Sequence, residues 1–132
     1  MKSTFFRFFS TVLLALSLSQ VAYAADAVVI SNSGTTISAG EVKDIFLGEK
    51  QFAGSTKLIP IDNAALQANF LSKYMNMAGD KYNSMWTKKS FRDGLTPPAV
   101  KTGDAEVIDY VKRTPGAVGY VSSAPTGVNV AK

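Results

Sequence analysis

The side chains that could do chemistry in this 132-residue sequence are few. Histidine and cysteine are both absent, which excludes the commonest general base, thiolate nucleophiles, and metal sites built from thiolates or imidazoles. Most of the ten carboxylates stand at expected helix starts or among lysines, where capping and solvation account for them. No acid–base pair stands out. We therefore expect no catalytic residue, no metal and no other cofactor.

Polar residues that could bind a ligand without catalysis occur in two segments, each next to an apolar run. The first segment is Ser31, Asn32, Ser33, Gly34 and Thr35. The second segment contributes Asp62, Asn63 and Gln67. Open α/β sheets place ligands beyond the carboxyl ends of their strands, so we expect residues 31–36 and 62–64 to converge there and to offer hydroxyls and free backbone amides to a small anion. Ordinary turn chemistry is the alternative for the first segment.

Two further groups have both a functional and a structural interpretation. The basic group consists of Lys88, Lys89 and Arg92. It is either a patch for an anion or an acidic partner, or a solvated helix end whose cations complement the helix dipole. The aromatic group consists of Tyr82, Trp86 and Phe91. It is either a stacking platform for a ring-bearing ligand or core packing at helical spacing, and in both groups we prefer the structural interpretation.

Short apolar runs between helical patterns must position these residues. They predict strands at 27–30, 58–61 and 117–121, with an optional edge strand from the alternation of Val128 and Val130. Without that edge strand, residues 124–132 would form a loosely held tail. Because the runs alternate with helical patterns, we expect an α/β domain with a small central sheet flanked by helices.

Four helices are expected from their start and stop signals. The first follows a Ser38–Glu41 capping box, buries Val42, Ile45 and Phe46, and ends at Gly48. The second is capped by Asp62 or Asn63 and stops at Gly79, a shorter third begins at Asp80, and Asp104 opens the last. Residues 90–102 are expected to be irregular. We expect one shared core to include Phe46, Phe70, Trp86 and Tyr120.

The N-terminus has the pattern of a cleavable signal peptide. Lys2 and Arg7 precede a short apolar run at 8–18, and Ala22-Tyr23-Ala24 forms a cleavage site. A membrane anchor is the alternative, but the run is shorter than the roughly 20 residues that a spanning helix needs. We therefore expect a signal peptide at 1–24 and one domain at 25–132. The mature chain would have a net charge of about +2, which is no nucleic-acid signature.

Three segments, in this order, resemble a known family. They are Ile37-Ser38-Ala39-Gly40-Glu41-Val42-Lys43-Asp44-Ile45-Phe46-Leu47-Gly48, then Tyr82 to Trp86 with Phe91, Gly94 and Pro97-Pro98, and last Thr114-Pro115-Gly116-Ala117-Val118-Gly119-Tyr120-Val121. The sequence resembles the phosphate-type (PstS-like) substrate-binding proteins of ABC transporters, and more closely their short, single-lobed members. The resemblance covers nearly all of the mature chain.

The resemblance implies one lobe of a periplasmic-binding-protein type II fold. Full-length members hold phosphate between two lobes, so a single lobe would need a second copy or another protein to form a clamp. The sequence departs from the family pattern after the second strand. Short members commonly place an arginine where this chain has Gln67, and a neutral amide does not replace its bidentate charged contact. Asp62 further disfavours a phosphate dianion.

Two functions remain as expectations. The first is periplasmic capture or sensing of phosphate or another small anion, bound weakly and without catalysis. The alternative is an envelope interaction module that has lost its ligand site and docks on another protein or on itself. An ABC transporter, an envelope protein or a second copy are the expected partners, and nucleic acid is not. The absence of cysteine removes a lipid anchor, so we expect a diffusible periplasmic protein, with secretion into the medium as the alternative.

Overall fold

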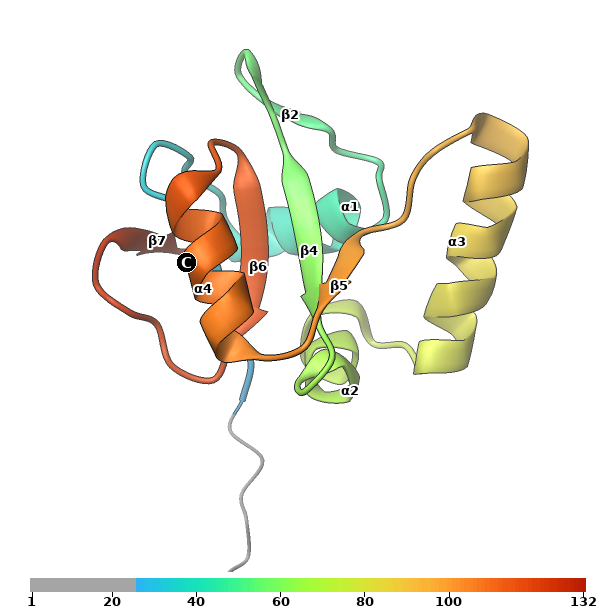
Figure 1. The fold of residues 1–132 in the computed structure, drawn as a ribbon. Helices are drawn as coiled ribbons and strands as arrows, with labels where there is room; N and C mark the ends of the chain where they lie inside the picture. The colour runs from blue at the N-terminus through green and yellow to red at the C-terminus, as the bar shows by residue number, and fades with distance from the viewer. Residues whose placement is uncertain (1–25) are drawn as a thin grey trace, which may run out of the picture.

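The computed structural model of the protein describes residues 26–132, and the expected signal peptide lies outside this range (Figure 1). A five-stranded mixed sheet forms the centre, in the order β5-β4-β6-β1-β7. Its strands are β1 (Val28–Asn32), β4 (Ile59–Asn63), β5 (Ala99–Lys101), β6 (Ala117–Val121) and β7 (Val128–Val130). The expected α/β class, with a small central sheet flanked by helices, is confirmed. So are the three expected strands and the optional strand at Val128–Val130.

Strand direction gives the sheet two different ends. β4 is parallel to β5 and β6, whereas β1 is antiparallel to β6 and β7. The carboxyl end of β1, with residues 31–35, therefore lies where β4 and β6 begin; we call this the loop end. Asp62 lies at the opposite end, which we call the cleft end. The expectation that residues 31–36 and 62–64 converge is wrong, because it requires β1 and β4 to run in the same direction.

Helices cover both faces of the sheet (Figure 1). α4 (Asp104–Arg113) packs Val107 and Val111 against Ile30 and Ile61 on one face. The other face is covered by α1 (Val42–Phe46), α2 (Gln67–Phe70) and the π-helical turn η2 (Leu71–Met75). Strand residues alternate between the two clusters, as the period of two in a strand requires.

The expected shared core is confirmed on the second face. Phe46, Phe70, Trp86 and Tyr120 belong to one buried cluster. The Phe70 ring stacks on the Tyr120 ring with centroids 4.0 Å apart and planes 5° apart, and its centroid lies 4.7 Å from that of Phe46. This cluster includes Tyr120, whose hydroxyl contacts Asp62 at the carboxyl end of β4, so the core packs directly against that end of the strand.

The first helix has the expected start, inward face and end. A short 3₁₀ turn, η1 (Ala39–Glu41), precedes α1, and the Ser38 N–H donates to the Glu41 carboxylate at 2.9 Å as a capping box requires. The expected residues Val42, Ile45 and Phe46 are buried. Gly48 follows with φ 72°, and a Cβ there would lie 2.9 Å from the Trp86 ring. Glycine is therefore needed both for backbone conformation and for packing.

The second helix begins later than expected. β4 continues through Asn63, and α2 starts at Gln67 after the N-cap residue Leu66, so neither Asp62 nor Asn63 caps it. Asn76, with φ 49°, ends η2 before Gly79 is reached. β4 therefore continues beyond its apolar run by two polar residues, Asp62 and Asn63, and the apolar run alone does not indicate this continuation.

The third helix, α3 (Gly79–Asp93), is the longest described helix and not the short one expected. It stands at the side of the sheet (Figure 1), and its buried residues are Tyr82 and Trp86. The Trp86 Nε1–H donates to the Phe46 carbonyl oxygen at 3.0 Å. Residues 95–98 then lead to β5, so the expectation of irregular backbone at 90–102 is wrong at both ends of that range.

The remaining elements form a small hairpin. β2 (Phe52–Ala53) and β3 (Thr56–Lys57) pair in antiparallel fashion before β4 and were not expected from the sequence. Within residues 26–132, none of the helices has the length and apolar character required to cross a membrane.

Candidate functional site

The candidate site is built around Asp62 at the cleft end. Although it carries a carboxylate, Asp62 is only 1% exposed. The Tyr82 hydroxyl of α3 donates to its Oδ2 atom, and the Tyr120 hydroxyl of β6 donates to its Oδ1 atom, each at 2.8 Å. Asp62 therefore links β4, β6 and α3 through one side chain.

The charge of Asp62 has no cationic partner in the described part of the chain. None of the four ion pairs there involves Asp62. Burial is the largest influence on its carboxyl and raises the pKa, against the opposing effect of the hydrogen bonds from Tyr82 and Tyr120. Burial and the Asp62 charge also raise the pKa of both tyrosines, which remain hydrogen-bond donors at neutral pH. The two hydroxyls therefore give the carboxylate hydrogen bonds but no positive charge to balance its own.

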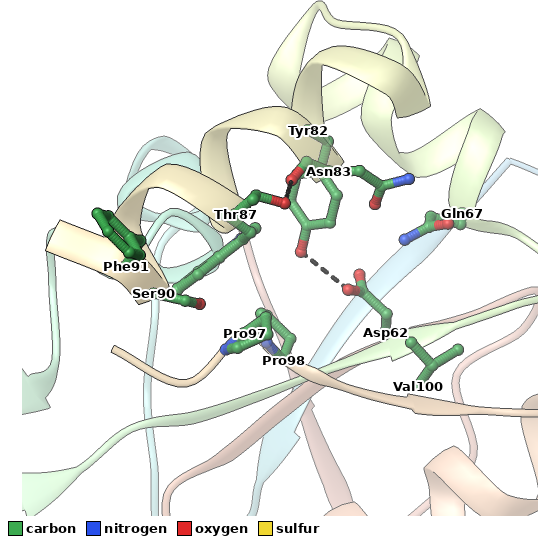
Figure 2. Close-up of a pocket in the computed structure, with 11 residues that line it drawn as sticks. Asp62, Gln67, Tyr82, Asn83, Thr87, Ser90, Phe91, Pro97, Pro98 and Val100 are labelled. Atoms are coloured by element: carbon green, nitrogen blue, oxygen red, sulfur yellow. Dashed lines mark hydrogen bonds between the residues drawn. The ribbon is translucent and has the colours of Figure 1, made fainter. Parts of the chain in front are cut away.

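A cleft of about 690 Å³ opens at Asp62, between α3 and β5. Figure 2 shows the Asp62 side chain directed toward the space between Gln67, Asn83 and Tyr82. The lining combines aromatic, apolar and neutral polar side chains: Asp62, Gln67, Tyr82, Asn83, Trp86, Thr87, Ser90, Phe91, Pro97, Pro98 and Val100. It includes no lysine or arginine, so the only charge at this cleft is the Asp62 carboxylate.

The side chains of the predicted segment at 31–35 are occupied by contacts within the fold. The Ser31 hydroxyl donates to the Thr35 carbonyl oxygen at 2.6 Å. The Asn32 amide nitrogen donates to the carbonyl oxygens of Val111 and Lys112, at 2.9 and 3.2 Å, where α4 ends. These contacts tie the end of β1 to the last turn of α4.

The backbone groups of the same segment, and the Thr35 hydroxyl, are also hydrogen-bonded within the fold. The Gly34 N–H donates to Asn32 Oδ1 at 3.0 Å, which forms an Asx turn. The Asn129 amide nitrogen donates to the carbonyl oxygens of Ser33 and Thr35 at 3.1 and 3.0 Å. Thr35 Oγ1 accepts the Gly116 N–H at 3.2 Å. The geometry therefore agrees with the turn interpretation of residues 31–35.

Of the other predicted residues, Asp62 and Gln67 are brought together and Asn63 is not. Gln67 lines the cleft beside Asp62 (Figure 2). Asn63 is fully buried, and its amide nitrogen donates to Asp104 Oδ1 at 2.8 Å and to the Tyr120 carbonyl oxygen at 3.0 Å. Asn63 therefore holds β4 to β6 and α4 and does not line the cleft.

No protein-family model matches the chain, and no curated protein matches its sequence. Among the solved structures that are similar is PstS from Borrelia burgdorferi, with 19% sequence identity and a TM-score of 0.48, over 80% of this chain and 46% of that chain. The chain thus spans about half the length of that protein, and a similarity of this degree says nothing about ligand or activity.

The sequence pattern did not indicate most of the cleft. Tyr82 and Tyr120 fit the core pattern, and nothing in their spacing shows that both hydroxyls meet one carboxylate. One signal was present: Asn83, Thr87 and Ser90 recur at helical spacing and form a polar stripe on α3 beside its buried aromatics. The preferred interpretation of the aromatic group holds for Tyr82 and Trp86, but it is wrong for Phe91, which is 92% exposed.

The basic group lies outside the cleft. Lys88, Lys89 and Arg92 border a separate hollow of about 260 Å³ on α3, and the Lys89 ammonium lies 3.8 Å from a Glu49 carboxylate oxygen. The described residues also contain no group of three or more His, Cys, Asp or Glu side chains that could hold a metal ion. Among the described residues, Asp62 is therefore the charged group that lines the larger cleft and could bind a ligand there.

Proposed function

We propose that the protein captures a small ligand in the cleft at Asp62 and performs no reaction on it. The cleft opens beside Asp62, at the carboxyl end of β4, and lies between α3 and the edge strand β5. Open α/β sheets commonly hold ligands near the carboxyl ends of their strands, and the buried Asp62 carboxylate facing an open cleft is the observation that carries the proposal.

Phosphate or another small anion is the ligand that the sequence resemblance suggests, and we propose that it binds weakly at most. The cleft offers neutral donors such as Gln67, Asn83 and Ser90 but no cationic side chain. An ionised Asp62 would repel a dianion, whereas a protonated one could donate to it. Neutral donors alone lead us to expect a dissociation constant of about 1 mM or weaker.

Thermal melting of the purified protein tests capture. Ligand binding to the native state raises its stability by RT ln(1 + [L]/Kd), so the panel should contain phosphate, sulfate, neutral sugars and organic cations at about 10 mM. We expect at least one class to raise the melting temperature. Val100→Trp, which fills the cleft from β5, should abolish that shift, whereas Val130→Trp on the opposite edge strand should keep it. No shift with any class would contradict the proposal.

An interaction module remains a second candidate because two large apolar side chains are exposed at the cleft. Phe91 is 92% exposed and Val100 is 59% exposed, on α3 and β5 respectively. A second copy of the chain could cover both. In this case light scattering should find a dimer that Phe91→Asp converts to a monomer. A protein that stays monomeric at about 1 mM would rule out self-association as the function.

Export is proposed on the sequence alone. The positive residues, short apolar run and Ala-x-Ala site at 1–24 support a cleaved signal peptide and a periplasmic site of action. An ABC transporter or another envelope protein would then receive the ligand. Intact mass of the protein from a periplasmic extract should correspond to a chain that begins at Ala25. Recovery of the uncleaved chain with the membrane fraction would contradict this.

A further inference from the structure

Building on the proposed capture function, we infer that the ligand is a small organic cation, a primary amine or guanidinium compound, whose charged group pairs with Asp62. Three features point to this class. A buried carboxylate faces an open cleft, no described basic side chain pairs with it, and aromatic and neutral polar groups line the cleft. A ligand cation would supply the countercharge that the fold omits.

The carboxylate retains hydrogen-bonding capacity for such a ligand. An ionised carboxylate has about four acceptor positions. Tyr82 and Tyr120 occupy one position on each oxygen of Asp62. The tyrosines also fix the carboxylate from two different elements, so the entropic cost of ordering this acceptor has already been met in folding. Because Asp62 is buried away from water, an adjacent cation stabilises its ionised form more than the same cation would in water.

The remaining polar groups of the cleft can accept the other protons of an ammonium or guanidinium group. Gln67 and Asn83 each have a side-chain carbonyl oxygen and lie beside Asp62 (Figure 2). Thr87 donates its hydroxyl proton to the backbone carbonyl oxygen of Asn83 at 2.9 Å, which leaves the Thr87 hydroxyl oxygen as an acceptor and the Asn83 side-chain oxygen free. An ammonium group has three protons to donate and no acceptor, so these groups match its chemistry.

The apolar part of the lining suits the rest of such a ligand. Tyr82, Trp86 and Phe91 contribute aromatic rings, and Pro97 and Pro98 contribute apolar surface. Aromatic faces attract organic cations and also pack against alkyl or aryl groups. We therefore expect amines with an apolar substituent to bind more tightly than methylammonium.

Other charged ligands fit less well. A divalent metal ion such as Ca²⁺ takes six to eight oxygen ligands, usually with several carboxylates, and this cleft has one. Phosphate would meet a carboxylate and no cation. The basic residues Lys88, Lys89 and Arg92 border a different hollow and do not alter the charge of the Asp62 cleft.

The test compares ligands of one shape and different charge. Isothermal titration of the purified protein at pH 7 would use benzylammonium, with benzyl alcohol as the neutral isostere and phosphate as the anion. We expect benzylammonium to bind at least about tenfold more tightly than benzyl alcohol, since hydrogen bonds to charged groups stabilise more than neutral ones. Butylammonium and methylammonium then measure the contribution of the apolar substituent.

Two variants locate the site. Asp62→Asn removes the charge and should weaken benzylammonium binding at least about tenfold, with near-ultraviolet circular dichroism as the check on its fold. Gln67→Arg keeps Asp62 and places an internal cation beside it, so it should weaken benzylammonium binding while strengthening phosphate binding. Ser72→Arg adds the same charge on η2 outside the cleft and serves as its matched control. It should leave both affinities unchanged.

The possible results distinguish a failure of the cation inference from a failure of the proposed capture function. Benzyl alcohol binding as tightly as benzylammonium, or phosphate binding more tightly than both, would overturn the cation inference and leave capture standing. Benzylammonium binding that survives in both Asp62→Asn and Gln67→Arg would place the cation elsewhere and also overturn the inference. Absence of binding by all these ligands, and by the wider panel, would overturn both.

Discussion

The loop end and the cleft end of the sheet both bury polar side chains, but they satisfy them differently. At the loop end, Ser31 and Asn32 bond to backbone carbonyl groups at the end of β1 and of α4. At the cleft end, Asp62 is held by two side-chain hydroxyls from different elements and borders open space. The first arrangement joins segments of the fold, whereas the second holds a charge ready for a partner.

The difference shows how a buried polar residue can be assigned a role. Neutral groups that bond to the backbone replace solvent and thereby allow a turn to be buried. A carboxylate buried without a cation costs stability, so its presence beside a cleft calls for a functional explanation. Substitutions at the loop end should therefore lower stability and leave ligand binding intact, and substitution of Asp62 should do the reverse.

The largest effect is expected from breaking the support of the cleft end. Phe70 is fully buried, and its ring stacks on Tyr120, whose hydroxyl binds Asp62. Phe70→Ala should lower the free energy of unfolding by about 3–5 kcal/mol, measured by urea denaturation. Phe91→Ala, at a 92% exposed ring, is the control and should change it by less than about 0.5 kcal/mol. Equal effects would show that the assigned core is incorrect.

A second large effect is expected at the loop end. Gly116 has φ 83°, and a Cβ there would overlap the Lys57 carbonyl oxygen. Gly54 has φ 61° with no atom near its Cβ position, so Gly54→Ala should show the backbone cost alone, about 1–2 kcal/mol. Gly116→Ala should cost more than this control in the same denaturation experiment. Equal costs would mean that β3 and β6 can separate freely at this point.

A smaller difference in stability is expected between alanine substitutions of two asparagines, Asn32 at the loop end and Asn83 at the cleft. Asn32→Ala leaves the Val111 and Lys112 carbonyl groups without their donor and should cost about 1–3 kcal/mol. Asn83 is exposed on α3 and lines the cleft, so Asn83→Ala should change stability by less than about 0.5 kcal/mol. Calorimetric melting of the two variants makes the measurement. A larger loss for Asn83→Ala would reverse the roles assigned to the two ends.

The smallest expected effect is a change in pH dependence. The pKa of Asp62 is raised above its ordinary value of 3.8, so between these two values the folded state binds more protons than the unfolded state. This contribution to stability is complete below about pH 3.8 and is lost as the pH rises through the folded pKa. Relative to Asp62→Asn, the wild type should therefore lose stability as the pH rises toward 7.

Asp104 provides a control of opposite sign. Burial acts to raise its pKa, but hydrogen bonds from Ser122 and Asn63 outweigh burial and lower it. Its contribution to stability is therefore present above the ordinary pKa and is lost as the pH falls. Relative to Asp104→Asn, the wild type should lose stability toward low pH. Chemical denaturation from about pH 2 to pH 8 would cover both slopes, because the Asp104 contribution changes below its ordinary pKa of 3.8 and the Asp62 contribution changes above its own. Equal slopes for the two variants would contradict the Asp62 assignment.

Local pattern was sufficient for much of the fold. The apolar runs located β1, β4 and β6, and the capping box located the start of the first helix, because these signals depend on neighbouring residues. Strand direction could not be predicted in this way. β1 pairs with β6 and β7, which lie far away in the sequence, and this pairing alone separates residues 31–35 from Asp62.

The candidate site was predicted only in part for the same reason. Asp62 and Gln67 stand close together in the sequence and meet at the cleft. The groups that give Asp62 its character come from α3 and β6, where Tyr82 and Tyr120 look like ordinary core residues. The β5 wall was missed because three residues beside two prolines carry little strand signal. A carboxylate that extends a buried strand is the local sign of such a site.

The position of β1 between β6 and β7 also bears on how the chain folds. Val28 pairs with Val121, and Ile30 pairs with both Gly119 and Val130, so the first strand gains its neighbours only from the last part of the chain. Pairings this distant in sequence slow folding, because a long loop must close before the contacts repay its entropy. β1 therefore stays unpaired until residues 117–130 are available, and the sheet is completed only when the first and last strands of the described chain meet.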